Sequence, residues 1–293
     1  MIVEAFKYAA ARLRGQSDKH GHLAEAIAME ARHQRQRHAW QTHLDNSRAL
    51  CLAATEACTA ERRRTALVVG SGLLLDVPLE ELCHRFDTVV LADLAFLPKV
   101  SARAKALGNV SLLRLDLTAC LDKLPELARL LTEGKDMAEV QNERLGPPPA
   151  LAAASHNHPK LLTIDFVYSA NVLSQLPLFV VPGLLRHAPH LPQTLLDIFA
   201  KALIDSHLVW LQTLPCPACL VTDRTEHATA FDKEATVITD LLYGATLPSG
   251  PGVQRWTWDF ACGGEAVAGM DVRRTVLGIL DMHTARYSEE NSR

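Results

Sequence analysis

The stretch TALVVGSGLLLDVPLEELCHRFDTVVLADL, residues 65–94, decides the fold class. It begins with a short apolar run that ends in Gly70-Ser71-Gly72. It continues through a segment of helical character and closes with a second apolar run that ends in Asp93. Continuous apolar runs of this length are typical of strands buried on both faces of a parallel sheet. The stretch therefore predicts a β-α-β unit.

The glycine turn and the acidic strand end indicate what this unit binds. Glycine lets the backbone approach a ligand closely, and a carboxylate at the tip of the second strand accepts hydrogen bonds from ribose hydroxyls. A carboxylate after a buried run is costly without a partner. We therefore predict that Gly70, Ser71, Gly72 and Asp93 hold the adenosine half of a cofactor. The alternative for Asp93 is a cap on the helix that follows it.

The alternation of strand and helix continues along the rest of the chain. Strands are expected at 66–70, 88–92, 110–115, 162–168, 218–223, 254–260 and 274–281, and helices at 77–85, 97–107, 122–133, 173–187 and 193–212. No long helix separates the last two strands, so we expect them to pair antiparallel at one edge. The prediction is an α/β fold with a doubly wound, mostly parallel seven-stranded sheet and an antiparallel edge pair.

The segment before the first strand is expected to be all helical. Residues 1 to about 60 contain no proline, and their only glycines, Gly15 and Gly21, are expected to separate two helices. In the second helix, Trp40, His43 and Leu44 belong to an apolar stripe with spacings of three and four. We therefore divide the chain into a helical N-terminal arm or lid at 1–62 and a sheet domain at 63–293.

Residues 133–160 interrupt the strand–helix pattern. The segment EGKDMAEVQNERLGPPPALAAASHNHPK shows no periodicity and contains three consecutive prolines. Such composition favours a loop or a partly ordered insertion. We expect it to join the third helix of the sheet domain to the fourth strand.

Residues 65 to about 281 resemble the class I S-adenosylmethionine-dependent methyltransferases, which have a Rossmann-like fold. In that family a glycine turn follows the first strand, a ribose-binding acidic residue ends the second, an acidic or polar residue beside the adenine follows the third, and the reaction centre lies after the fourth. The segments LVVGSG, VVLADL, VSLLRLDL and TIDFVYSANVLSQLP match these landmarks in order. The resemblance implies S-adenosylmethionine as cofactor, with further contacts from Leu94, Asp116, Leu117, Ser169 and Asn171.

Several residues at these landmarks have a second interpretation. Leu75 stands where a third glycine is common in the family. Asp76 either orients the turn or caps the following helix, and Asp116 could cap the helix expected after it. The resemblance places Tyr168, Asn171 and Gln175 at the reaction centre, but it names neither the acceptor nor a catalytic base.

The function implied by the resemblance is methyl transfer to a small or medium-sized metabolite held under the N-terminal helices. One alternative is a catalytically inactive methyltransferase-like domain that binds a partner through its helical arm. Another is an NAD(P)-dependent oxidoreductase. That class expects G-x-G-x-x-G, where this chain has Leu75, and a Tyr-x-x-x-Lys pair, whereas Tyr168 is followed four residues later by Val172.

Composition and charge argue against other classes. The chain has 293 residues with 48% apolar and 22% charged side chains, which is ordinary for a soluble globular protein. No apolar run reaches the roughly 18 residues of a membrane span, and we see no signal peptide. Residues 1–64 hold 11 Lys and Arg against 7 Asp and Glu, but no basic patch is interleaved with aromatic residues as nucleic-acid binding requires. We expect a cytoplasmic protein, with its oligomeric state open.

Cysteine and histidine patterns do not predict a metal site. The close histidine pairs lack the i, i+4 spacing of a zinc helix. The seven cysteines are scattered, and the C-x-x-C of Cys216 and Cys219 has no second pair, so we interpret both as partly buried thiols. We name His187, Asp223 and His227 as candidates for the acceptor side of a pocket.

Overall fold

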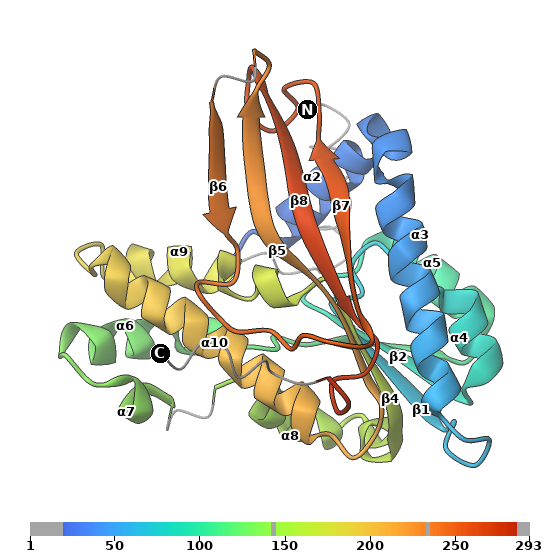
Figure 1. The fold of residues 1–293 in the computed structure, drawn as a ribbon. Coiled ribbons are helices and arrows are strands. Elements are labelled where there is room, and N and C mark those ends of the chain that lie inside the picture. Colours follow the sequence, from blue (N-terminus) through green and yellow to red (C-terminus); the bar gives the residue numbers. More distant parts are fainter. Residues whose placement is uncertain (1–19, 142–144, 233–234, 286–293) are drawn as a thin grey trace.

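The computed structural model describes residues 20–141, 145–232 and 235–285 (Figure 1). The strands are β1 (Thr65–Val69), β2 (Thr88–Asp93), β3 (Val110–Arg114), β4 (Ile164–Ala170), β5 (Ala218–Ala230), β6 (Thr236–Asp240), β7 (Val253–Ala261) and β8 (Met270–Ile279). They form one eight-stranded sheet in the order β3-β2-β1-β4-β5-β8-β7, with β6 paired to β5. The first five strands of this order are parallel, and β8 and β7 add antiparallel. The predicted sheet with its antiparallel edge pair is confirmed, with one strand more than expected.

The additional strand is β6, which the sequence pattern did not reveal. All five of its residues are exposed, and it pairs with the outer part of β5, from Thr225 to Thr229. That part of β5 extends beyond β4, whose last pair joins Ala170 to Val221. A strand with no buried face shows no apolar periodicity, and this is why β6 is absent from the prediction.

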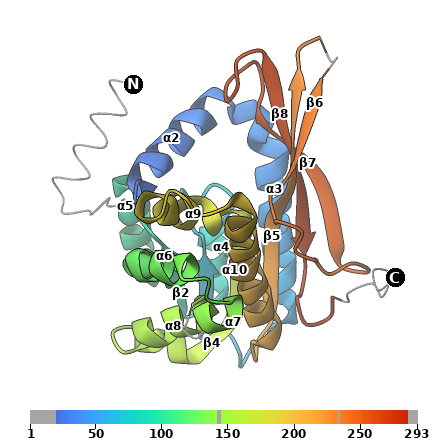
Figure 2. The ribbon, with the colours of Figure 1, turned by 90° about the vertical axis from the view of Figure 1, so that its left-hand side faces the viewer.

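Helices cover both faces of the sheet. They are α2 (His22–Arg35), α3 (Arg37–Ala54), α4 (Leu79–Arg85), α5 (Pro98–Leu107), α6 (Leu124–Thr132), α7 (Met137–Gln141), α8 (Pro147–Ser155), α9 (Pro177–His187) and α10 (Gln193–Thr213). On β1, Ala66 and Val68 face α3, α4 and α5, whereas Leu67 and Val69 face α10 (Figure 2). Burial on both faces explains why β1 is a continuous apolar run.

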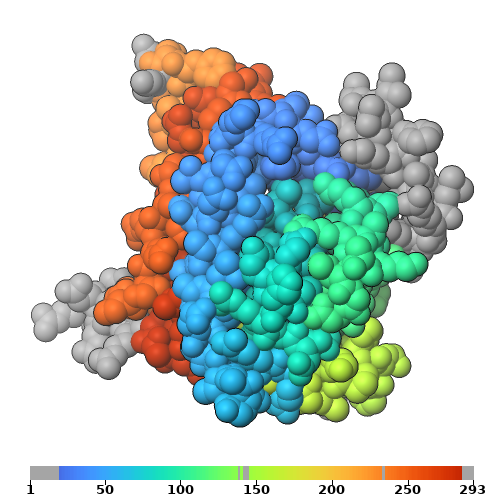
Figure 3. Space-filling view, turned by 90° about the vertical axis from the view of Figure 1, so that its right-hand side faces the viewer, coloured from blue at the N-terminus to red at the C-terminus, as the bar shows by residue number. Residues whose placement is uncertain are grey.

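The helix α3 packs directly on the antiparallel side of the sheet. The indole N–H of Trp40 donates a 2.8 Å hydrogen bond to the carbonyl oxygen of Phe260 on β7, and both rings are buried. The apolar stripe read from the sequence is therefore the face that α3 buries. In Figure 3 this helix (blue) lies between the orange-red strands and the teal α4–α5 region.

The helix α2 precedes α3 in the chain and lies across the end of the sheet. Its residues Leu23 and Ile27 are buried against Leu97, just before α5. Gly21 has a φ of 84° and precedes α2, and the break between α2 and α3 falls at Gln36. The first helix expected in the arm, with Gly15, lies outside the described residues.

The segment 133–160, expected as a loop, contains two short helices. They are α7 and α8, and a 3₁₀ turn at Pro159–Thr163 follows them. The three prolines occupy the first turn of α8, where the missing backbone N–H groups have no helical partner to lose. The rest of α8 is a run of small residues without an amphipathic pattern, so periodicity gave no signal. Residues 142–144 lie outside the described part of the chain.

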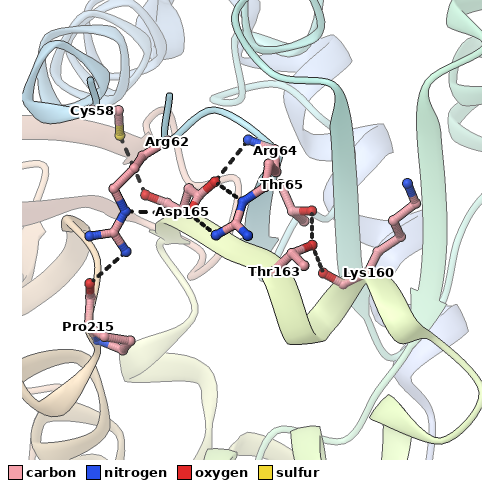
Figure 4. Close-up of polar contacts among 8 residues, drawn as sticks. All are labelled: Cys58, Arg62, Arg64, Thr65, Lys160, Thr163, Asp165 and Pro215. Carbon is pink, nitrogen blue, oxygen red and sulfur yellow. Dashed lines mark hydrogen bonds and ion pairs between the residues drawn. The ribbon is translucent and has the colours of Figure 1, made fainter. Parts of the chain in front are cut away.

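At the amino-terminal end of the sheet, Asp165 ties β4 to the residues that enter β1 (Figure 4). Its buried carboxylate accepts hydrogen bonds from the backbone N–H and Nε of Arg64, each at 2.9 Å, and from Nη2 at 2.7 Å. The Nε of Arg62 lies 3.6 Å from the same carboxylate. The Arg64 guanidinium holds the pKa of Asp165 at about 2. This contact fixes the strands at the end opposite the pocket described below.

Asp165→Asn should lower the free energy of unfolding by about 1–3 kcal/mol at neutral pH, because the buried group loses its charge-assisted hydrogen bonds. The pKa of Asp165 in the folded protein lies below the ordinary 3.8. The stabilisation by its carboxylate is therefore complete above pH 3.8 and is lost as the pH falls through about 2. Urea denaturation at neutral and low pH measures both effects. Equal stabilities of variant and wild type at pH 7 would contradict the assignment.

Candidate functional site

A pocket lies where the parallel strands end. Counted with its open mouth, it encloses about 1210 Å³ between the carboxyl ends of β1 to β4 and the helices α2, α3 and α9. The strand order reverses between β1 and β4, so the pocket occupies the topological switch point of the sheet, where ligands of open α/β folds bind.

The glycine turn forms one wall of the pocket. Gly70 and Gly72 have φ values of 72° and 48°, and Leu74 has 59°, so three alternate residues adopt left-handed backbone. A Cβ on Gly70 would collide with the side chain of Val172, which makes this glycine necessary for packing against the end of β4. A Cβ on Gly72 would come no closer than 3.8 Å to any protein atom. Added bulk at Gly72 would therefore meet a ligand and no protein atom, and the positive φ strains any other L-residue there as well.

Asp93 joins the end of β2 to the glycine turn and lines the pocket. One carboxylate oxygen accepts a 2.7 Å hydrogen bond from the N–H of Gly72, and the other accepts one of 2.7 Å from the N–H of Leu94. Burial raises the pKa of Asp93, and these backbone N–H groups oppose that rise. The N–H of Ala95 also donates to this carboxylate, so three of its four acceptor sites are taken and one remains for a ligand.

Asp116 also lines the pocket, but its carboxylate is fully used within the protein. One oxygen accepts from the N–H and the hydroxyl of Thr118, at 2.9 and 2.6 Å. The other accepts from the N–H groups of Cys120 and Leu121, at 2.9 and 2.8 Å. Four donors fill four acceptor sites. This geometry favours the capping interpretation of Asp116 and leaves the neighbouring Leu117 to contact a ligand by packing.

Asn171 and Gln175 stand at the end of β4, and both line the pocket. Asn171 has a φ of 50°, a conformation that asparagine tolerates better than most residues. Its side-chain oxygen accepts a 2.9 Å hydrogen bond from the N–H of Asp223, and its carbonyl oxygen accepts one of 2.6 Å from Gln175. The strand end is thus held in a fixed shape.

Three predicted site residues do not line this pocket. Ser71, Tyr168 and Ser169 are fully buried, and the hydroxyl of Ser169 lies 3.0 Å from Nε2 of His207 on α10. Burial raises the pKa of Tyr168 well above its ordinary value. The remaining predicted residues, which are Gly70, Gly72, Asp93, Leu94, Asp116, Leu117, Asn171 and Gln175, do line it.

The opposite wall of the pocket contains residues that sequence reasoning did not assign to a site. Trp40 and His43 come from α3, Trp258 comes from β7, and Asp76 follows the glycine turn. The sequence predicts that the N-terminal helices pack on the sheet domain or cover the pocket, but it names no residue of α3 as a site residue. Asp76 forms no side-chain cap on α4, so the capping interpretation fails there.

The three acceptor-side candidates from the sequence lie elsewhere. His187 is exposed at the end of α9, and His227 lies on the outer part of β5 beside Thr225. Asp223 is buried behind the pocket, where its carboxylate accepts a 2.8 Å hydrogen bond from Nη1 of Arg274. None of the three is a lining residue.

The pocket is acidic. Among the described residues its lining includes four carboxylic acids and no lysine or arginine: Glu25, Asp76, Asp93 and Asp116. Burial raises the pKa of Asp76 to about 6, and the neighbouring charges of Asp223 and Asp93 add to that rise. A pocket of this kind attracts cations and repels phosphate groups.

The strand order decides the fold family. A dehydrogenase sheet continues with a sixth parallel strand, whereas here antiparallel β8 follows β5 and β7 closes the edge. The sheet is therefore the mostly parallel, doubly wound sheet with an antiparallel edge pair that the sequence predicts, and it differs from a dehydrogenase sheet. The glycine turn, the acidic end of β2 and the β1/β4 switch point all border one pocket.

Comparisons with known proteins found weak similarity to solved structures alone. No family model and no curated protein matches the sequence. Solved structures with a similar arrangement include DhpI in a SAM–HEP complex, at 13% identity over 85% of this chain and 93% of that chain, with a TM-score of 0.33. Another is Burkholderia thailandensis 1,6-didemethyltoxoflavin-N1-methyltransferase with 1,6-didemethyltoxoflavin and S-adenosylhomocysteine. It is 12% identical over 89% of this chain and 91% of that chain, with a TM-score of 0.31. A third is the O-methyltransferase TomG from Streptomyces achromogenes with SAM. It is 15% identical over 86% of this chain and 89% of that chain, with a TM-score of 0.27.

The cysteines singled out in the sequence have a packing role. Cys216 and Cys219 are buried free thiols, and burial raises the pKa of Cys216 to about 12. Within the described ranges, no group of three or more His, Cys, Asp or Glu side chains is placed to hold a metal ion. No helix in the same ranges is long and apolar enough to cross a membrane.

Proposed function

We propose that this protein is an S-adenosylmethionine-dependent methyltransferase that acts on a small or medium-sized metabolite. The observation that carries the proposal is the acidic pocket at the switch point of the sheet. S-adenosylmethionine bears a sulfonium cation, which four carboxylic acids attract. A dinucleotide bears a pyrophosphate, which they repel. The same observation weighs against an NAD(P)-dependent oxidoreductase.

The residues present fit the adenosine part of this cofactor. Gly72 leaves space for a ligand against the backbone, and Asp93 keeps one acceptor site for a ribose hydroxyl. Leu94 and Leu117 supply apolar surface for the adenine ring. Asn171 closes the site at the end of β4, where the methyl group would point toward the acceptor.

The cofactor supplies an activated methyl group when it is bound, so the protein needs few reacting residues. Its task is to align donor and acceptor and to exclude water. We assign the acceptor to the space under α2 and α3, since both helices line the pocket opposite the strand ends. Asn171 and Gln175 are placed to orient it there, whereas Tyr168 supports them from behind.

Isothermal titration calorimetry with S-adenosylmethionine, S-adenosylhomocysteine and NADH tests the cofactor assignment. We expect micromolar binding of the first two compounds and none of NADH. Absence of binding by either sulfur compound would contradict the proposal and would favour the alternative of an inactive domain that binds a partner.

Gly72→Ala sharpens the test. Its methyl group enters the pocket wall, so we expect S-adenosylhomocysteine to bind at least about tenfold more weakly, which is about 1.4 kcal/mol. Gly108→Ala is the matched control, since Gly108 also has a positive φ, of 79°, and open space around a Cβ, but lies at the end of α5. Equal affinities of the two variants would place the ligand away from the turn.

A further inference from the structure

The accessible surface of the pocket beside the glycine turn is aliphatic and carries a carboxylate. Met29 on α2 and Leu73 and Leu75 after the glycines line the pocket, and their side chains are partly exposed. The aromatic rings of the opposite wall, by contrast, are almost fully buried. Asp76 follows Leu75, lines the same pocket and is also partly exposed. A ligand in this part of the pocket therefore meets hydrocarbon side chains and the carboxylate of Asp76.

This carboxylate has almost no partner within the protein. Among the described residues, its only hydrogen bond comes from its own backbone N–H. Tyr168 donates its hydroxyl to the backbone carbonyl oxygen of Asp76 at 3.4 Å and leaves the carboxylate free. The guanidinium of Arg48 donates to the carbonyl oxygen of Leu75 and is paired with Asp45. A partly buried carboxylate with unused acceptor sites is costly unless a ligand fills them.

The other buried carboxylates around the pocket are already paired or hydrogen-bonded. Asp93 accepts from three backbone N–H groups, and Asp116 accepts from four donors. Asp223 shares Arg274 with Glu226, each at 2.8 Å. Among the described lining residues no lysine or arginine is left to pair with the remaining carboxylate. Its unused acceptor sites therefore favour a ligand cation that donates hydrogen bonds.

The chemistry of that cation follows from what it must donate. A sulfonium has no hydrogen on its charged atom, so the charge of the cofactor attracts the carboxylate but cannot fill its acceptor sites. An ammonium group carries its charge on a nitrogen with N–H donors. The aliphatic side chains beside the carboxylate suit the hydrocarbon part of the same molecule. A protonated aliphatic amine meets both requirements.

We propose that the methyl acceptor is an aliphatic amine that enters the pocket as an ammonium ion and donates an N–H to the carboxylate of Asp76. This inference rests on the proposed function and names the substrate class of the same site. A proton passes from the ammonium to Asp76, which frees the lone pair of the nitrogen. That lone pair forms a bond to the methyl carbon as the carbon–sulfur bond breaks. The electron pair of the broken bond goes to sulfur, and the proton leaves Asp76 for water.

The surroundings of Asp76 suit this transfer at neutral pH. The titratable and charged groups that face it are Asp93 on β2, Tyr168 on β4, Asp223 on β5, and Arg48 and Cys51 on α3. Burial and the two carboxylates raise the pKa of Asp76, and its own backbone N–H and the guanidinium lower it, to give about 6. The phenol and the thiol stay neutral, because burial raises the pKa of each. Burial and the nearby sulfonium lower the pKa of a bound amine, which brings it closer to that of Asp76.

The probes hexylamine and 1-hexanol test this inference without turnover. They have the same hydrocarbon chain, but only the amine is a cation at pH 7. We would titrate each into the complex with S-adenosylhomocysteine by calorimetry and expect the amine to bind at least about tenfold more tightly. At pH 5 this preference should shrink, because Asp76 is then protonated while the amine keeps its charge. Equal binding of the two probes at pH 7 would overturn the amine class.

Two variants locate the effect. In Asp76→Asn the preference for the amine should disappear, whereas in Glu25→Gln, which removes a carboxylate from the same pocket on α2, it should persist. Binding of S-adenosylhomocysteine by each variant shows that it folds. A preference that survives in Asp76→Asn overturns the role of Asp76. A preference lost in both variants overturns it as well, since the cause would then be the general field of the pocket.

A third ligand separates the acceptor from the cofactor, which carries an ammonium group of its own. The compound 5′-methylthioadenosine lacks the amino-acid end of S-adenosylhomocysteine. We expect Asp76→Asn to leave the ratio of the two affinities unchanged. If the substitution weakens S-adenosylhomocysteine by about tenfold and spares 5′-methylthioadenosine, Asp76 holds the cofactor and the inference is overturned. If S-adenosylhomocysteine binds and hexylamine does not, this inference fails alone; if neither binds, the proposed function fails with it.

Discussion

Asp93→Ala should weaken the binding of S-adenosylmethionine by about 5- to 150-fold. The hydrogen bonds from Gly72, Leu94 and Ala95 leave the carboxylate of Asp93 one acceptor site. We assign this site to a ribose hydroxyl, which alanine would leave unpaired in a buried environment. The cost is about 1–3 kcal/mol, and 1.4 kcal/mol is tenfold in affinity. Calorimetric titration of both proteins measures it.

The same substitution should also destabilise the protein in the absence of ligand. The N–H of Gly72 donates to Asp93, and without the carboxylate the glycine turn loses one of its hydrogen bonds to β2, while those to the carbonyl oxygen of Ala92 remain. We expect the free energy of unfolding to fall by about 1–3 kcal/mol. Urea denaturation without cofactor separates this loss from the loss of affinity. Burial raises the pKa of Asp93, so the affinity of the wild type should decline on acidification above the usual titration range of an aspartate.

Asp122→Ala is the matched control for charge. Asp122 is exposed in the turn before α6 and does not line the pocket. If the pocket attracts the sulfonium only through its long-range field, both alanine variants should weaken binding alike. Wild-type affinity in Asp93→Ala would show that the end of β2 does not hold the ribose.

The cofactor side of the pocket was predictable because it is local in sequence. A buried parallel strand must be apolar on both faces, and the residue at which the apolar run stops is the residue that reaches the pocket. This rule located Gly70 after β1 and Asp93 at the end of β2. It also located Asp116, but not its four internal hydrogen bonds, because those depend on how the chain turns back toward α6.

The acceptor side was not predictable in the same way, because it joins distant parts of the chain. His43 and Trp256 are 213 residues apart, and Trp40 and Phe260 are 220 apart. Both α3 and β7 were expected as elements, but no periodicity says that their aromatic residues meet. The apolar stripe of α3 packs on the sheet and lines the pocket with the same residues. The sequence predicted a helical lid over the pocket, but it did not show which residues of that lid line it.

Asp76 shows why a turn conceals a site residue. The left-handed backbone at Gly70, Gly72 and Leu74 directs the chain along a path that spacing does not encode. A leucine at positive φ is not a sequence signal at all. The sequence therefore left Asp76 open between orienting the glycine turn and capping the next helix, whereas in the structure it lines the pocket and forms no side-chain cap.

His207→Gln should make the protein less sensitive to mild acid. His207 is fully buried in α10, with Nε2 3.0 Å from the hydroxyl of Ser169 and Nδ1 without a hydrogen-bond partner. Burial lowers its pKa to about 3. In the unfolded chain the ring has its ordinary pKa of 6.5. Between pH 6.5 and about pH 3 the unfolded state therefore binds one proton more than the folded state. Stability must therefore fall as the pH falls.

The linkage relation gives the size of this effect. One such histidine costs at most about 1.4 kcal/mol per pH unit below 6.5, or about 2 kcal/mol between pH 7 and pH 5. The pKa of His43 is also lowered to about 3, so this residue causes a second loss of stability as the pH falls. Asp76 acts in the opposite direction, because its folded pKa is raised and it takes up a proton before the unfolded chain does. The wild-type pH profile is a sum of these effects, so the substitution is needed to isolate one of them.

Glutamine at position 207 keeps an amide N–H near the position of Nε2 but cannot be protonated. We expect the variant to lose about 2 kcal/mol less stability than the wild type between pH 7 and pH 5, as measured by urea denaturation at each pH. Ser169→Ala is the control, since it removes the partner hydroxyl and lowers stability at both pH values, while His207 still titrates. An unchanged pH dependence in His207→Gln would mean that the ring is already solvated in the folded state. A pH dependence lost in Ser169→Ala as well would assign the effect to the hydrogen bond instead of burial.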